Sequence, residues 1–181
     1  MKKIIVAITG DTPLLMHNPA QMRGAQGGKK TIPSAEDEAA AGRYLMPDGK
    51  TLCLKADHIH QCLINASAGF RISGRESVAP YMSGSLEIAP ELISLGTEKY
   101  EIDTRRGVVQ KQGVLRSRPK VFPWKARFEL HYDEDVFAEA FLTGTLRDQI
   151  FLKAGKAVGL LDYRPAKKGR FGRFHVSKWE M

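Results

Sequence analysis

A segment near the C-terminus combines positive charge, glycine and aromatic rings. Residues 164–174 have the sequence RPAKKGRFGRF. Cationic groups neutralise phosphates, glycines let a backbone approach a ligand closely, and aromatic rings stack on bases. The segment therefore predicts a nucleic-acid contact made by Arg164, Lys167, Lys168, Arg170, Phe171 and Arg173. The alternative is a solvated basic turn whose phenylalanines belong to the core, and for Phe174 we favour the core because Val176 shares its face.

A second basic cluster lies in residues 105–127, which contain no Asp or Glu. Such a stretch cannot neutralise itself, so its positive potential should extend into the solvent. Basic hairpins beside aromatic rings suit single strands, on which bases stack without much sequence preference. The alternative is a solvated charged face around a core tryptophan. The candidate contact residues of this cluster are Arg105, Arg106, Lys111, Arg116, Arg118, Trp124, Lys125 and Arg127.

The histidines and cysteines offer weaker chemistry. His58 and Cys62 lie four residues apart on a predicted helix, but no further ligands follow at a recognised zinc spacing, and Cys62 falls on the apolar stripe. We therefore predict no metal site. His17 could act as a general base in RNA cleavage, because its ordinary pKa is near neutral. Its segment supplies no partner carboxylate or second histidine, so we predict no catalytic residue.

Composition narrows the classes of function. The chain has 181 residues, 28 Lys and Arg against 20 Asp and Glu, and a formal charge of +8. This balance favours an anionic partner, with nucleic acid first. Phosphate loops, dinucleotide-binding glycine motifs, zinc-protease motifs and nucleophile elbows are absent from the sequence, so we predict neither a cofactor nor an enzyme.

The setting that we expect is a cytoplasmic one without a membrane. Only Cys53 and Cys62 occur, and no CxxC pair is present. The apolar run after Met1 is too short for a signal peptide, and no run approaches the roughly 20 apolar residues of a membrane span.

Hydrophobic periodicity predicts the elements of one domain, residues 1–181. We expect strands at 3–9 and 124–132, a helix at 55–68 and a helical region at 133–158, with a last strand from about 173. Smaller expected elements are a glycine-rich mobile loop at 17–33, a short helix capped by Ser34 and two short strands at 43–46 and 51–54. Residues 70–120, punctuated by Gly and Pro, predict a β-rich insertion with exposed hairpins.

This order of elements is compatible with an α+β fold of the ferredoxin-like (RRM-like) type. In such a fold two helices cover one face of an antiparallel sheet. The β-rich hairpin insertion would then project from that core.

Several segments of the chain together resemble a group of small phage and prophage proteins of largely unassigned role. They are residues 8–18 (ITGDTPLLMHN), 116–119 (RSRP), Trp124, 158–165 (VGLLDYRP) and 169–174 (GRFGRF). The glycine-rich basic loop after the second helical region is also similar to that of the RAMP superfamily, the RNA-binding proteins of CRISPR effector backbones. The RAMP resemblance implies an RRM-like core, an inserted hairpin thumb and self-association along a single strand.

The leading hypothesis is a single-stranded nucleic-acid-binding protein that holds phosphates with its basic loops and assembles, as a homo-oligomer or filament, on RNA or DNA. It requires both basic stretches to fold onto a common surface and to be free of acidic neighbours. The alternatives are a RAMP-like endoribonuclease that uses His17, and a phage protein that inhibits a host nucleic-acid machine.

Overall fold

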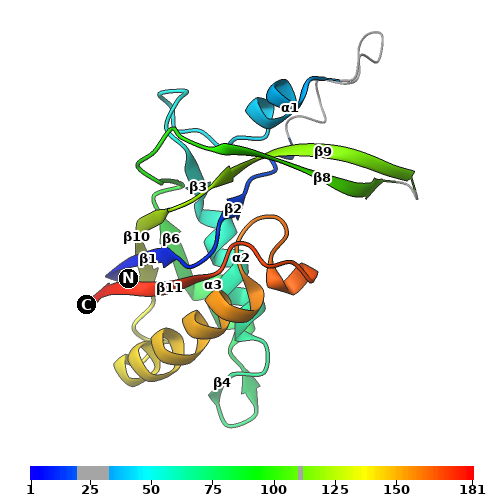
Figure 1. The fold of residues 1–181 in the computed structure, drawn as a ribbon. Coiled ribbons are helices and arrows are strands. Elements are labelled where there is room, and N and C mark those ends of the chain that lie inside the picture. Colours follow the sequence, from blue (N-terminus) through cyan, green and yellow to red (C-terminus); the bar gives the residue numbers. More distant parts are fainter. Residues whose placement is uncertain (20–32, 110–111) are drawn as a thin grey trace.

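The computed structural model describes residues 1–19, 33–109 and 112–181 (Figure 1). Lys111 and most of the loop predicted at 17–33 lie outside these residues. Among the described helices, none is both long enough and apolar enough to cross a membrane.

A four-stranded antiparallel sheet forms the centre of the molecule. Its strand order is β11 (Phe174–Glu180), β1 (Lys2–Gly10), β10 (Lys125–Tyr132) and β6 (Leu86–Ala89). All three neighbouring pairs are antiparallel. Alternate residues of β10 are buried, as the predicted period of two requires, because successive side chains of a strand point to opposite faces.

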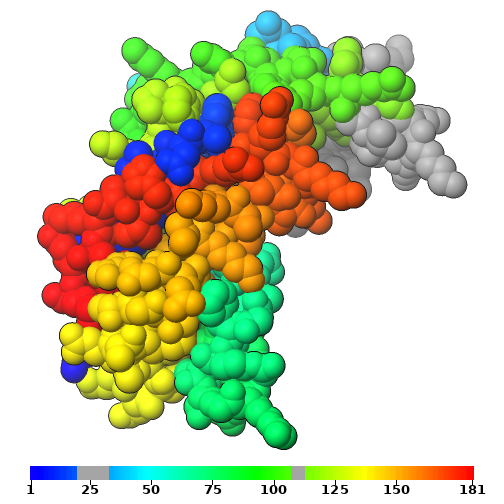
Figure 2. Space-filling view, turned by 60° about the horizontal axis from the view of Figure 1, so that its bottom comes forward, coloured from blue at the N-terminus to red at the C-terminus, as the bar shows by residue number. Residues whose placement is uncertain are grey.

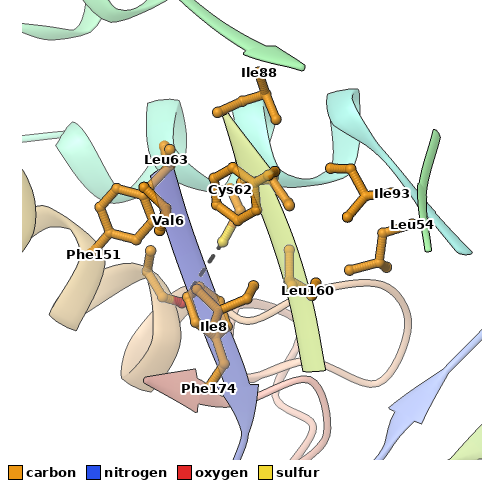
Figure 3. Close-up of a cluster of buried hydrophobic side chains, with 14 of the residues drawn as sticks. Val6, Ile8, Leu54, Cys62, Leu63, Ile88, Ile93, Phe151, Leu160 and Phe174 are labelled. Atoms are coloured by element: carbon orange, nitrogen blue, oxygen red, sulfur yellow. Dashed lines mark hydrogen bonds between the residues drawn. The ribbon is translucent and has the colours of Figure 1, made fainter. Parts of the chain in front are cut away.

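Helices cover one face of this sheet. The first is α2 (Ala56–Ser67), which buries Ile59, Cys62, Leu63 and Ala66 at helical spacing. The second comprises two π-helical segments in succession, η2 (Phe141–Phe151) and η3 (Ala154–Val158). Figure 3 shows Val6 of β1, Leu63 of α2 and Phe151 of η2 in one apolar cluster, so both helical regions pack on the same side.

None of the described helices packs on the other face of the sheet. Lys125 and Arg127 of β10 are exposed there, and Ile5 and Ala7 of β1 are only half-buried. The apolar run at residues 3–9 is typical of a strand covered on both faces, and the structure differs, because the described helices cover only one face of β1. The order β1, α2, β6, β10, η2–η3, β11 is a β-α-β-β-α-β series, and it is consistent with a ferredoxin-like α+β fold.

A second, three-stranded sheet projects from the core. It contains β2 (Leu14–Leu15), β9 (Gln112–Val121) and β8 (Glu101–Val109), and β8 and β9 form a long hairpin. The short helix α1 (Ala35–Ala41) packs on β9. Its predicted cap is confirmed, since Ser34 Oγ accepts a hydrogen bond of 3.1 Å from the Asp37 backbone N–H.

The predicted insertion at 70–120 is partly wrong. Its strand β6 belongs to the central sheet, and residues Ala79–Ser85 form a helix, α3, where we expected only strands. Pro80 and Gly84 are residues that usually interrupt helices, so the sequence pattern did not predict this one. Met82 is buried in the core and attaches the helix to it. The remaining short strands of this region are β4 (Arg71–Ser73), β5 (Glu76–Ser77) and β7 (Leu92–Ser94), the last of which pairs with β3 (Cys53–Lys55).

Candidate nucleic-acid interface

The β8–β9 hairpin carries most of the second basic cluster. In its register Asp103 lies opposite Arg118, and Arg105 lies opposite Arg116. Because side chains two residues apart share a face of a strand, these four begin on one face of the hairpin. Three arginines and one carboxylate therefore occupy two neighbouring cross-strand pairs on that face.

Residues 159–173, which we call the basic loop, connect η3 to β11. The Gly172 N–H donates to the Pro13 carbonyl at 2.8 Å, and the Asp162 N–H donates to the Leu15 carbonyl at 3.1 Å. Gly172 has a φ of 69°, and a Cβ at this position would lie 2.0 Å from the Leu160 carbonyl oxygen. Only glycine fits there, so the loop has a fixed backbone path.

Three non-glycine residues of the basic loop adopt left-handed backbone conformations: Leu161, Tyr163 and Lys168. Leu161 has a φ of 58° and Tyr163 a φ of 52°. This region is sparsely populated for residues with a Cβ, and such residues cluster at functional sites. Leu161 and Tyr163 flank Asp162, which forms an ion pair with Arg118 of the hairpin.

The hairpin and the basic loop meet at one junction (Figure 2). Arg118 Nη1 lies 2.7 Å from Asp162 Oδ2. The guanidinium carbon of Arg105 lies 4.4 Å from the ring centre of Tyr163 and 4.8 Å from that of Phe171. Two basic segments far apart in sequence therefore form a continuous surface, as the binding hypothesis requires.

Acidic residues neutralise part of the hairpin. Arg105 forms an ion pair with Asp103, and Arg116 Nη1 lies 3.0 Å from Glu38 Oε1 of α1. Together with the pair between Arg118 and Asp162, these contacts leave the three arginines with carboxylate partners. Residues 105–127 contain no acidic residue, but the fold brings acidic residues from other segments next to them. The requirement for cations free of acidic neighbours therefore fails for Arg105, Arg116 and Arg118.

The remaining predicted cations carry no salt bridge to any residue that the structure describes. All but Arg164 are exposed, and Arg164 is half-buried, with its Nη1 donating to the Leu161 carbonyl at 2.7 Å. Lys125 and Arg127 lie on the open face of the central sheet rather than at the junction. The set comprises Arg106, Lys125, Arg127, Arg164, Lys167, Lys168, Arg170 and Arg173.

The two aromatic residues predicted to stack on bases are engaged by the protein itself. Trp124 is 2% exposed, and its Nε1 donates to the Thr12 carbonyl at 2.8 Å. It is a core residue, which corrects the prediction that its ring stacks on a base. Phe171 is half-buried, edge-to-face with Tyr163 at 5.4 Å. Phe174 is buried, as expected.

His17 lies in a pocket that sequence reasoning did not find. The pocket is lined by His17, Tyr44, His58, Leu161, Asp162 and Arg164. The Tyr44 hydroxyl donates to the His17 carbonyl at 2.8 Å. Burial, with a smaller contribution from Arg118, lowers the pKa of His17 below its ordinary value. Tyr44, His58 and Asp162 were missed because their approach depends on four separate segments, and no local signal reports it.

Cys62 is a core thiol. Its Sγ donates to the Gly159 carbonyl at 3.4 Å and to the Ala154 carbonyl at 3.7 Å, and burial raises its pKa to about 12. Figure 3 shows Cys62 among the apolar side chains of the core. In the described parts of the chain, no three His, Cys, Asp or Glu side chains come close enough to hold a metal ion.

The architecture combines a core consistent with a ferredoxin-like fold, an inserted hairpin and a glycine-rich basic loop after the second helical region. The protein is similar to one chain of a solved structure described as "Cryo-EM structure of the Type III-B Cmr-beta bound to cognate target RNA", with a TM-score of 0.58 and 15% sequence identity. The match covers 98% of this chain and 59% of that one.

At this identity the likeness shows the fold alone, and this chain spans 59% of the length of the chain it matches. No protein-family model matches the sequence, and no curated protein does. The likeness agrees with the fold that the RAMP resemblance implies, and nothing among the comparisons supports the phage resemblance.

Proposed function

We propose that this chain binds a single RNA strand along the junction of the β8–β9 hairpin and the basic loop. The observation that carries the proposal is the contact between them, through Arg118 and Asp162 and through Arg105 with Tyr163 and Phe171. It joins the acid-paired arginines of the hairpin and the exposed cations of the basic loop into one surface.

Within this proposal the phosphates are held by Lys167, Lys168, Arg170 and Arg173, which are exposed and have no salt bridge among the described residues. Arg105, Arg116 and Arg118 support the path instead, since their carboxylate partners already neutralise them. Contacts to phosphates position a strand without reading its sequence, so we expect little sequence preference from these residues.

RNA is favoured over DNA because the structurally similar chain belongs to an assembly bound to target RNA. We extend the proposal to an RRM-like arrangement of the core and to assembly with other subunits along the RNA, either copies of this chain or different proteins. The proposed chain is a binding protein and not an enzyme.

Fluorescence anisotropy with labelled oligonucleotides of about 20 nucleotides tests this function. The panel contains single- and double-stranded RNA and DNA, each measured from 50 to 200 mM salt. We expect single-stranded RNA to bind most tightly and its affinity to fall with salt, because phosphate contacts release counterions. An affinity that does not change with salt, or equal binding of all four probes, contradicts the proposal.

A second candidate function is cleavage of RNA by His17. It is favoured by one observation: the structure places a second histidine, His58, in the pocket that His17 lines. The lowered pKa leaves His17 neutral near pH 7 and able to accept a proton. Incubation of hairpin RNA with the wild-type protein and the His17→Ala variant separates the candidates, since a binding protein leaves RNA intact in both.

A further inference from the structure

A pocket of about 240 Å³ lies beside the basic loop, and phosphate binding does not account for it. Its lining comes from the segment after β2, from the segment between α1 and β3, from α2 and from the loop itself. A smaller cavity of about 140 Å³ shares His58, Leu161 and Arg164 with it and continues to the exposed amides of Gln61 and Asn65. The two cavities therefore adjoin and form one recess along α2.

Aromatic rings form one wall of this recess. Tyr44 and His58 pack edge-to-face, with ring centres 4.7 Å apart. The Lys55 backbone N–H donates to His58 Nδ1 at 3.2 Å, and burial lowers the pKa of His58 to about 4. The imidazole is therefore neutral near pH 7 and carries its proton on Nε2, where it can serve as a donor.

The opposite wall supplies both donors and acceptors. Arg164 Nη1 donates a hydrogen bond to the Leu161 carbonyl, and Asp162 Oδ2 forms the ion pair with Arg118. The Nε of Arg118 is buried and has no hydrogen-bond partner among the described residues. One guanidinium and one carboxylate line the pocket with two imidazoles whose pKa values are lowered, so its charge is close to balanced.

This chemistry suits a planar, uncharged and polar ligand. A phosphate would prefer a cluster of uncompensated cations, such as the one on the outside of the basic loop. A nucleobase offers a flat ring together with a mixed donor and acceptor edge, and proteins recognise unpaired RNA by splaying such bases out and holding them by ring contacts and hydrogen bonds.

The recess lies next to the proposed RNA path. Asp162, which lines it, is the residue that bonds Arg118 of the hairpin, and the next residue, Tyr163, contacts Arg105. Five of its six lining residues are only half-buried, so the pocket is open to solvent. Backbone hydrogen bonds from the Asp162 N–H to the Leu15 carbonyl at 3.1 Å and from the Phe171 N–H to the Tyr163 carbonyl at 2.9 Å hold this wall in place.

We infer that this pocket receives one unpaired base of the bound RNA, splayed out from the strand at the junction. The inference rests on the proposed function, because it needs an RNA strand on the adjoining surface.

The test compares a single-stranded RNA with a strand of the same length that lacks its bases, at fixed salt. Wild-type protein should bind the base-containing strand between five- and a hundredfold more tightly. In the His58→Ala variant this ratio should fall at least threefold. The matched control is His60→Ala, two residues along α2, whose side chain lines a different cavity and contacts the Met82 carbonyl. It should keep the wild-type ratio.

The outcomes separate the two proposals. If neither strand binds, the proposed function fails. If both strands bind equally, or if folded His58→Ala keeps the wild-type ratio, RNA binding stands and the base pocket is overturned. Crosslinking of wild-type protein to RNA that carries 4-thiouridine needs no variant, and it should label residues 44–65 or 158–164; labels confined to the outer loop residues 166–173 contradict the pocket.

Discussion

Arg105 shows how a single cation can organise an interface without binding a ligand itself. Its guanidinium lies against the rings of Tyr163 and Phe171 and is held by Asp103. Arginine suits this position because its planar group stacks on aromatic faces and donates in a fork. The residue therefore attaches the basic loop to the hairpin, whereas the sequence analysis predicted that it contacts nucleic acid.

His58 carries the first prediction at this scale. Its pKa is lowered from 6.5 to about 4, mainly by burial, so the folded protein binds fewer protons than the unfolded chain between these values. The stabilising contribution of the neutral ring is complete above pH 6.5 and is lost as the pH falls toward 4. Between pH 7.5 and 4.5 it amounts to about 2 kcal/mol after allowance for solvent around the half-buried ring.

The His58→Gln variant removes this titration while Gln can still reach back to the Lys55 N–H. In urea unfolding at pH 7.5 and 4.5, the variant should lose about 2 kcal/mol less stability than the wild type. Gln61→Ala, an exposed neighbour on the same helix, should behave as the wild type does. An identical loss in wild type and His58→Gln would show that the ring does not resist protonation.

At the scale of elements, the junction depends on the shape of the basic loop. Backbone hydrogen bonds to Pro13 and Leu15 fix the loop against the segment around β2, and the glycine positions permit these close approaches. The loop presents its exposed lysines and arginines on a rigid support, which reduces the entropy lost when phosphates bind.

Gly172→Ala tests this rigidity. The substitution puts a Cβ 2.0 Å from the Leu160 carbonyl oxygen at a φ of 69°, so it should lower the free energy of unfolding by more than about 3 kcal/mol or disorder the loop and weaken RNA binding. Gly49→Ala is the matched control, because its φ is 70° and nothing lies within 4 Å of the added methyl group. It should cost only about 1 kcal/mol. Equal losses, measured by urea denaturation, would show that the close approach is unimportant.

Across the whole molecule the formal charge is +8, but the cations differ in whether an acidic residue neutralises them. Arg105, Arg116 and Arg118 of the hairpin pair with acids, whereas the outer cations of the basic loop do not among the described residues. If the proposed function holds, we expect the position of unpaired charge to matter more for RNA binding than the total charge.

A charge-matched comparison tests this statement. Lys167→Gln with Arg170→Gln should reduce the slope of log affinity against log salt by about 1.4, since each phosphate contact to a single strand contributes about 0.7. Lys50→Gln with Arg75→Gln removes the same charge from exposed positions on the turn before β3 and on the β4–β5 hairpin, away from the junction (Figure 1). It should leave the slope nearly unchanged. Equal slopes for the two double variants would mean that only total charge matters.

The elements whose apolar residues recur at a regular period could be predicted from the sequence. The alternation along β10, the stripe on α2 and the Ser34 cap each depend on neighbours within a few residues, so a local pattern reports them. The sequence also located both basic segments. It did not show α3, because Pro80 and Gly84 disturb the pattern and a few buried contacts of Met82 stabilise the helix instead.

The tertiary structure was needed to show which cations have acidic partners and which aromatic rings are buried. Glu38 reaches Arg116 across 78 positions of sequence, and Trp124 donates to a carbonyl 112 positions away. Such contacts depend on how strands pair and where a loop returns to the sheet, and local spacing carries no record of them. The pocket around His17 and His58 belongs to the same category, since its walls come from segments that approach one another only when the chain has folded.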